Sequence, residues 1–239
     1  MGLIRNLTAN EIISQVILAK EISIRENLPP LTNIVFMGMG DAGRNPDAVS
    51  DAVHCLIDRD RLSMPQNKIT ISTVGPNPEM FTILSQIPAT LAWSLHSPDD
   101  RIRKLLVPST KHTTIELRNG FMNALLLRDN IKSRTIMIAI TLIDNINDST
   151  DDAIKVAEFI LPMLTVSPKI VIDLIPYNDN ELNNFKTPSK EKVNNFQNIL
   201  KNYGLFCAVR MTRGDKESSA CGMLATKRVK TNKTKLIIN

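Results

Sequence analysis

The chain has 239 residues, of which 43% are hydrophobic, so it is long enough for one sizeable domain with a buried core. It has 29 basic and 24 acidic residues, giving a formal net charge of +5. Charges interrupt its apolar stretches well before the roughly 18 residues that a transmembrane helix needs, and residues 1–5 lack the apolar centre of a signal peptide. We therefore expect no membrane-spanning segment.

The excess positive charge is concentrated at the C-terminus. Residues 226–239 contain five basic residues and no acidic one, so the preceding 225 residues hold 24 bases and 24 acids. Such a tail can bind phosphate backbones non-specifically, or it can be no more than a solvated terminus. We divide the chain into a core of residues 1–225 and a basic tail of residues 226–239.

Hydrophobic periodicity predicts helices that alternate with strands. A capping box at Thr8 and Glu11 opens a helix over residues 8–26, and Gly204 ends the last one. We expect further helices at 46–58, 77–86, 99–105, 113–128, 149–163 and 189–202. We expect strands at 33–37, 68–73, 89–94, 134–142, 170–174 and 205–210. This alternation implies an α/β fold with a parallel sheet, and six strands are too few for a full eight-fold barrel.

Polar clusters follow several of these strands, where barrel-like α/β folds place their functional groups. The residues concerned are Gly40, Asp41, Ser72, Ser94, Leu95, His96 and Asn178. Backbone amides, small hydroxyls and acid or amide groups suit a ligand that contains an amino acid and a ribose. Each group also has a structural alternative. The glycines at 38 and 40 can simply make a turn, the serines can cap strand ends, and the histidine can bond to backbone alone.

The three cysteines are Cys55, Cys207 and Cys221, and no pair has the spacing of a metal site. Cys55 and Cys207 lie within apolar patterns, so we predict that both are core residues. Cys221 stands between Ala220 and Gly222, just after the charged run 213–217. This placement indicates a thiol used for chemistry or for pairing with another thiol, the alternative being an inert small residue near a helix start.

Several runs together resemble the radical S-adenosylmethionine (SAM) methyltransferases that methylate carbon 2 of adenine in ribosomal and transfer RNA. In the family's order they are RNLTANEIISQV (5–16), NIVFMGMGD (33–41), ITISTVG (69–75), LAWSLHSPDDRIRKLLVP (91–108), LIDNINDSTDDA (142–153), LIPYN (174–178), PSKEKVNNFQNIL (188–200) and VRMTRGDKESSACGMLA (209–225). The resemblance covers about residues 2–227. It implies an open, partial (β/α)6 barrel, here without its first strand and cluster loop.

The resemblance also implies roles for individual residues. SAM is expected to contact Gly40, Asp41, Ser72, Ser94, Leu95, His96 and Asn178, with the first two at the position that binds its amino group. Asp41 replaces the family's Glu and Ala42 its Pro, so the shorter carboxylate can need a water to reach the amine. Cys221 is expected to accept a methyl group from one SAM, and a radical from a second SAM then activates that methyl for attack on adenine.

The resemblance further implies a 4Fe-4S cluster, whose Cys-x3-Cys-x2-Cys ligands lie in the family just upstream of RNLTANEI and are not in this chain. We therefore expect no metal site and no RNA methylation by this chain alone. The expected partner is RNA, bound by a monomer in the cytoplasm or an organelle. Arg210 and Arg213 can hold the RNA backbone or form salt bridges with Asp215 or Glu217. A non-catalytic SAM- or RNA-binding paralogue is the alternative, and an unrelated α/β barrel enzyme for a phosphorylated ligand is a third hypothesis.

Overall fold

The computed structural model describes residues 4–37, 40–179 and 184–210. Six strands form one sheet in which each strand is parallel to its neighbours and the spatial order follows the chain. They are β1 (Ile34–Phe36), β2 (Ile69–Thr73), β3 (Thr90–Ser94), β4 (Ile136–Leu142), β5 (Ile170–Pro176) and β6 (Phe206–Val209). All six predicted strands are confirmed, with ends that differ by at most two residues.

The seven predicted helices are also confirmed. They are α1 (Ala9–Arg25), α2 (Pro46–Ile57), α3 (Pro78–Ser85), α4 (Asp100–Leu106), α5 (Thr114–Leu126), α6 (Thr150–Ile160) and α7 (Lys190–Asn202). Thr8 and Glu11 form the predicted capping box, and Gly204 follows α7 in the left-handed region with φ +77°. The sequence pattern missed the short 3-10 helices Ala42–Arg44, Gln66–Lys68, Ile131–Arg134 and Leu161–Thr165. The last of these replaces the final predicted turn of α6 because Pro162 lacks the amide proton that an α-helix needs there.

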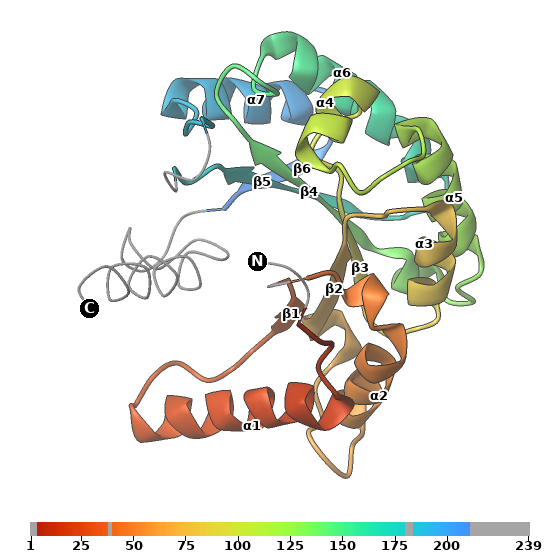
Figure 1. The fold of residues 1–239 in the computed structure, drawn as a ribbon, viewed down its shortest axis with the longest axis vertical. Helices are drawn as coiled ribbons and strands as arrows, with labels where there is room; N and C mark the ends of the chain where they lie inside the picture. Colours follow the sequence, from red (N-terminus) through yellow and green to blue (C-terminus); the bar gives the residue numbers. More distant parts are fainter. Residues whose placement is uncertain (1–3, 38–39, 180–183, 211–239) are drawn as a thin grey trace, which may run out of the picture.

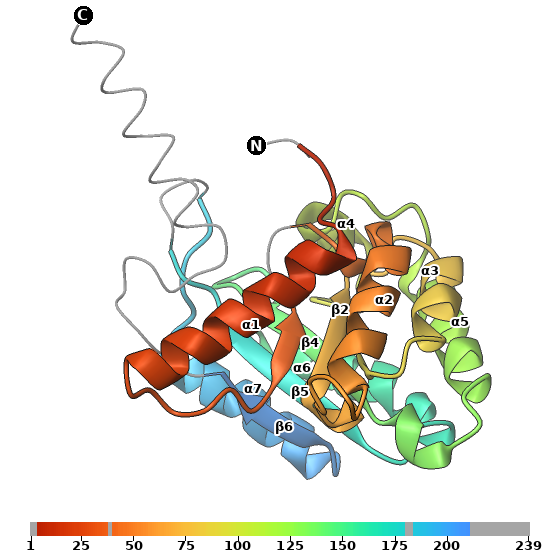
Figure 2. The ribbon, with the colours of Figure 1, turned by 90° about the horizontal axis from the view of Figure 1, so that it is seen from below.

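Helices cover the outer, convex face of the curved sheet, with α2 to α7 arranged around it in an arc (Figure 1). The strands present alternate side chains to these helices, and those side chains are almost entirely aliphatic and buried. On β2 to β5 they are Ile69, Ile71, Leu91, Trp93, Ile136, Ile138, Ile140, Leu142, Ile170, Ile172 and Leu174. Helix α1 lies beside α2 and contributes the buried Val16 to the same core (Figure 2).

The concave face of the sheet has a different composition. Its side chains come from the intervening strand positions, and toward the carboxyl ends of the strands many of them are small or polar. The strand register defines two rows of these side chains. One contains Ser72, Ala92, Met137, Val171 and Phe206, and the next, nearer the carboxyl ends of the strands, contains Ser94, Ala139, Asp173 and Ala208. Parallel sheets are normally rich in large β-branched residues on both faces, and closed barrels fill their interiors with them. The row nearer the carboxyl ends is therefore built differently from a packed barrel core.

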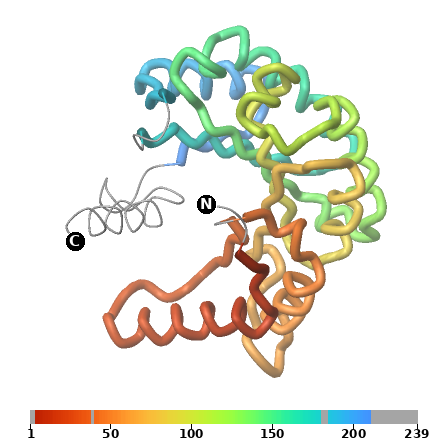
Figure 3. Tube along the Cα trace, in the orientation of Figure 1, coloured from red at the N-terminus to blue at the C-terminus, as the bar shows by residue number. Residues whose placement is uncertain are grey.

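The two edge strands are connected across the concave face. Arg210, which follows β6, forms an ion pair with Asp173 of β5, and its Nη1 donates to Met37 Sδ, just after β1, at 3.4 Å. Burial raises the pKa of the Asp173 carboxyl above its ordinary value, and the charge of Arg210 partly offsets this. Contact between residues after the first and the last strand shows how strongly the sheet curls, as the chain path in Figure 3 also shows.

Candidate functional site

Asp41 lies where β1 leads into the first 3-10 helix, and its carboxylate is engaged on both oxygens. Oδ1 accepts from the Gly43 amide at 2.8 Å. Oδ2 accepts from the Val74 amide at 2.8 Å and from Thr73 Oγ1 at 3.1 Å. The carboxylate thereby joins the loop after β1 to the loop after β2. Its predicted contact with an amino group stays a prediction, and this geometry gives the residue a structural task as well.

Ser72 and Ser94 meet on the concave face. Ser72 is the second-last residue of β2 and Ser94 the last of β3, and their hydroxyl oxygens lie 3.2 Å apart. Ser72 is buried and Ser94 is half-buried. The sequence predicted that both belong to one site, and the structure brings them together. Leu95 follows as a fully buried residue, and its amide donates to the carbonyl oxygens of Trp93 and Ala139, both at 3.0 Å.

The backbone of His96 has a left-handed conformation, with φ +60°. Its Nδ1 accepts a hydrogen bond from the Thr141 amide at 3.2 Å, which leaves the proton of the neutral ring on Nε2. Burial and the nearby charge of Arg103 lower its pKa to about 4, so the ring is neutral at physiological pH. Asn147 fixes the same turn by donating to the carbonyl oxygens of His96 and Thr141, both at 2.8 Å. His96 therefore makes the backbone hydrogen bond that the sequence analysis gave as its structural alternative, and its Nε2–H is available as a donor.

Gly40 and Asn178 are the remaining predicted positions in the described part of the chain. Gly40 has φ +84°, and a Cβ built on it would meet nothing within 4 Å, so its backbone faces open space. Asn178 is half-buried in the segment after β5, directly after Tyr177, whose amide donates to the Leu142 carbonyl at 2.9 Å. Both positions therefore follow carboxyl ends of strands, as expected. Gly38, Arg213 and Cys221 lie outside the described residues.

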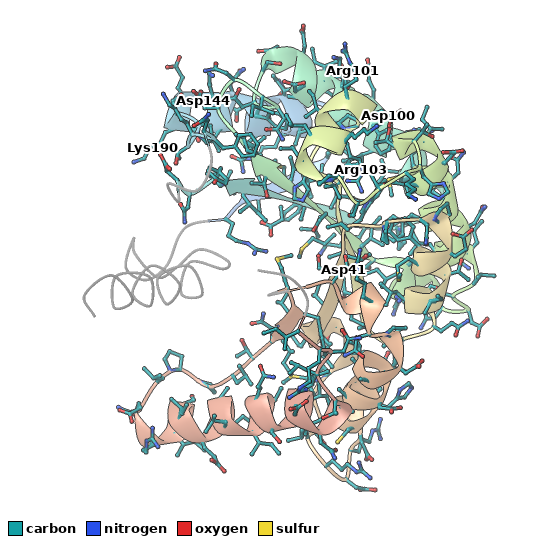
Figure 4. All side chains as sticks on the ribbon, viewed as in Figure 1. Asp41, Asp100, Arg101, Arg103, Asp144 and Lys190 are labelled. Atoms are coloured by element: carbon teal, nitrogen blue, oxygen red, sulfur yellow. The ribbon has the colours of Figure 1, made fainter. Side chains whose placement is uncertain are left out.

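Arg103 is a member of the site that the sequence did not reveal. Its side chain extends from α4 toward the strand ends, and the residue is 1% exposed (Figure 4). The guanidinium donates to the Ser94 carbonyl at 3.1 Å, to the Leu95 carbonyl at 2.5 Å and to the Val74 carbonyl. Burial lowers its pKa to about 10. Asp100, Arg101 and Lys104 surround this arginine with charged neighbours in α4, so no sequence signal marks it as buried.

Possible metal ligands do not gather at one point in the described part of the chain. Among the described residues, no group of three or more His, Cys, Asp or Glu side chains is arranged to hold a metal ion. Cys207 is buried in β6, as predicted. The prediction that Cys55 is a buried core residue is wrong: it is half-buried on α2, and its sulfur accepts a hydrogen bond from Arg61 Nη1 at 3.5 Å. Over the same part of the chain, no helix is both long and apolar enough to cross a membrane.

The fold defines a class: an open, partial α/β barrel, here with its predicted site residues at the carboxyl ends of the strands. A structure of a radical SAM methyltransferase from Sphaerobacter thermophilus superposes with a TM-score of 0.83 and 33% identity, covering 93% of this chain and 63% of that one. A domain of pyruvate-formate lyase-activating enzyme from Bacteroides vulgatus has the same fold, with a TM-score of 0.54 and 19% identity.

Curated relatives agree with this class. The probable dual-specificity RNA methyltransferase RlmN of Carboxydothermus hydrogenoformans is 35% identical over 227 residues, 95% of this chain and 63% of the relative. The RlmN of Vesicomyosocius okutanii is 34% identical over 238 residues, 98% of this chain and 63% of the relative. No protein-family model matches. The resemblance found in the sequence is thereby confirmed: homologues of this chain are named dual-specificity RNA methyltransferases, and the chain spans 63% of the length of these two.

Proposed function

We propose that this chain forms the SAM-binding part of a radical SAM RNA methyltransferase, and that the whole protein methylates carbon 2 of adenine in ribosomal or transfer RNA. The observation that supports this best is the concave face at the strand ends, where small side chains and the Ser72–Ser94 hydroxyl pair replace the bulky residues of a closed barrel. The relatives that cover most of the chain support the same class of activity.

The residues fit SAM in their chemistry. The bare backbone at Gly40 suits a carboxylate or amino group, the two serine hydroxyls suit the amino acid or ribose, and His96 offers a fixed Nε2–H donor. Asn178, whose side chain can donate and accept, follows β5 at the same end of the sheet. Leu95 keeps the turn after β3 in place through its bonded amide and carbonyl, and Asp41 shapes the loops after β1 and β2. When SAM is bound, it supplies the methyl group for transfer.

For the transfer step we propose Cys221 as the acceptor. Its thiolate would attack the sulfonium methyl of SAM, forming a carbon–sulfur bond on the cysteine while the electron pair of the broken bond stays on the sulfur of S-adenosylhomocysteine. The chain's three cysteines, at positions 55, 207 and 221, lack cluster spacing. By itself the chain is therefore expected to bind SAM without methylating RNA.

Calorimetric titration of the purified chain with SAM tests the binding site. Ser94→Ala should weaken binding about tenfold, because one hydrogen bond contributes about 1–1.5 kcal/mol. Thr90→Ala is the matched control, since Thr90 lies on the same face of β3 at its other end. Absence of SAM binding by the wild-type chain, or equal effects of the two substitutions, would refute the site.

The activity and the RNA are tested in the organism that encodes the protein. Mass spectrometry of nucleosides should show 2-methyladenosine in ribosomal or transfer RNA, and its loss when the gene is deleted or carries Cys221→Ala. Unchanged 2-methyladenosine in the deletion strain would refute the proposal.

We also propose that residues 226–239 form a separate basic tail that adds salt-sensitive RNA affinity. Deleting the tail should flatten the dependence of RNA binding on salt.

A further inference from the structure

We propose that Arg103 is a positioning residue, which sets the Ser94–His96 turn and joins it to the end of β2 through three backbone carbonyl groups. The proposal rests on the proposed function, because it assigns the arginine to the SAM site described above. Arg103 itself is fully buried and offers no surface to a ligand. Its contribution is therefore indirect, through the backbone that presents Ser94 and His96.

The three carbonyls belong to the two loops that form the site. Ser94 is the last residue of β3 and Leu95 follows it, while Val74 directly follows β2. Val74 is held from both sides, because its amide donates to Asp41 Oδ2 while its carbonyl accepts from the guanidinium. A continuous set of hydrogen bonds thus runs from the loop after β1, through the loop after β2, to the turn after β3.

The planar guanidinium is suited to this task. One Arg side chain presents five donors in a fixed fork, and here it engages carbonyls from two neighbouring loops at once. It also lies against the Trp93 ring, 5.5 Å from the centroid, and the indole Nε1 donates to the same Val74 carbonyl at 3.3 Å. A lysine in its place has the charge but not the fork, so it cannot keep all three contacts in one geometry.

Stability alone does not account for a charge at this position. Among the described residues Arg103 forms no ion pair with a carboxylate, and its buried Nε has no hydrogen-bond partner. Burying a cation is costly, and a well-packed apolar side chain is often at least as stable. The guanidinium instead fixes the backbone next to His96, and the left-handed conformation of His96 is unusual for a residue other than glycine.

A second buried arginine provides a matched control. Arg128 is 8% exposed, and its guanidinium also donates to backbone carbonyls, those of Ser85, Ile87, Ala89 and Ser133. These carbonyls lie at the amino end of β3 and β4, the opposite end of the sheet from the site. Replacing Arg128 therefore removes a comparable set of buried bonds without touching the proposed site.

The experiment compares Arg103→Lys, Arg103→Met and Arg128→Met in the purified chain. Urea unfolding measures stability, calorimetry measures SAM affinity, and nitrogen-15 NMR of the histidine rings reports the tautomer of His96, assigned with a His96→Gln variant. We expect Arg103→Lys to weaken SAM binding about tenfold and to disturb the Nε2–H tautomer. We expect Arg128→Met to lose stability while its SAM affinity stays within about twofold of wild type.

The outcomes separate this proposal from the proposed function. If the wild-type chain does not bind SAM, the proposed function fails, and the His96 signals still test the positioning role without ligand. Arg103 variants that fold with unchanged His96 signals would overturn the proposal. Unfolding of both Arg103 variants under conditions where Arg128→Met stays folded would also overturn it, since the role would then be purely structural.

Discussion

Replacing Asp41 with alanine is the sharpest test of how the loops of the site are held. The change removes an acceptor that binds two backbone amides, each at 2.8 Å, and the Thr73 hydroxyl at 3.1 Å. Each buried donor left without a partner costs about 1–3 kcal/mol, and water can reach part of this half-buried position. The expected loss of unfolding free energy is therefore about 2–4 kcal/mol. Asp41→Asn keeps one acceptor oxygen and should lose about half as much.

Urea unfolding followed by circular dichroism measures this loss. If the free energy of unfolding depends on urea concentration with the same slope as in the wild type, the substitution has not altered the unfolded state. Asp51→Ala is the control, because Asp51 is an exposed residue in α2 and its removal should change stability by at most about 0.5 kcal/mol. An Asp41→Ala protein as stable as the control would refute the reasoning. SAM affinity measured on Asp41→Asn then shows whether the charge also contributes to the ligand.

Three further predictions concern buried or strained groups. The pKa of His96 is lowered to about 4 in the folded protein, whereas an unfolded histidine has a pKa of about 6.5. As the pH falls from about 6.5 to 4, the unfolded chain therefore binds a proton that the folded chain does not, and the free energy of unfolding should drop by up to about 3 kcal/mol. A His96→Gln variant with the same pH dependence as wild type would contradict this. Burial raises the pKa of Cys207 to about 12, so iodoacetamide at pH 8 should alkylate Cys55 well before Cys207 in the native protein, as peptide mapping can show. Equal alkylation rates would refute the assignment. Gly75→Ala should cost more than about 2 kcal/mol in urea unfolding, because φ is +62° and the new Cβ would lie 2.3 Å from a phenylalanine ring. Gly204→Ala, at φ +77° with nothing within 4 Å, should cost only about 1 kcal/mol, and similar losses at both positions would show that crowding is not the cause.

The alternation of elements could be predicted from the sequence because its signals are local. Thr8 with Glu11, Asp99 before α4 and Gly204 after α7 all mark helix ends through bonds within a few residues. The helix-facing residues of the strands are aliphatic, so strands such as β4 also stand out. The juxtaposition of Ser72 and Ser94 follows once two parallel strands are known to be neighbours.

Other features depend on distant partners and leave no local trace. Arg103 is buried because three carbonyls from two other segments surround its head group, although its neighbours in sequence resemble those of an exposed helix. Asp173 was missed for a similar reason, since one acid within the apolar strand β5 becomes informative only when Arg210 is found opposite it. Cys55 shows the opposite failure: an apolar local pattern predicted burial, but its position on α2 leaves the sulfur beside Arg61.

The contact between Met37 and Arg210 has a consequence for how the molecule assembles. Each strand pairs with the one that precedes it in the chain, so the sheet can grow by adding one unit at a time as the polypeptide is synthesised. Met37 and Arg210 are 173 positions apart, and they can meet only after β6 has joined the sheet. A spectroscopic probe at this pair would therefore report completion of the sheet, whereas a probe between β1 and β2 would report its beginning.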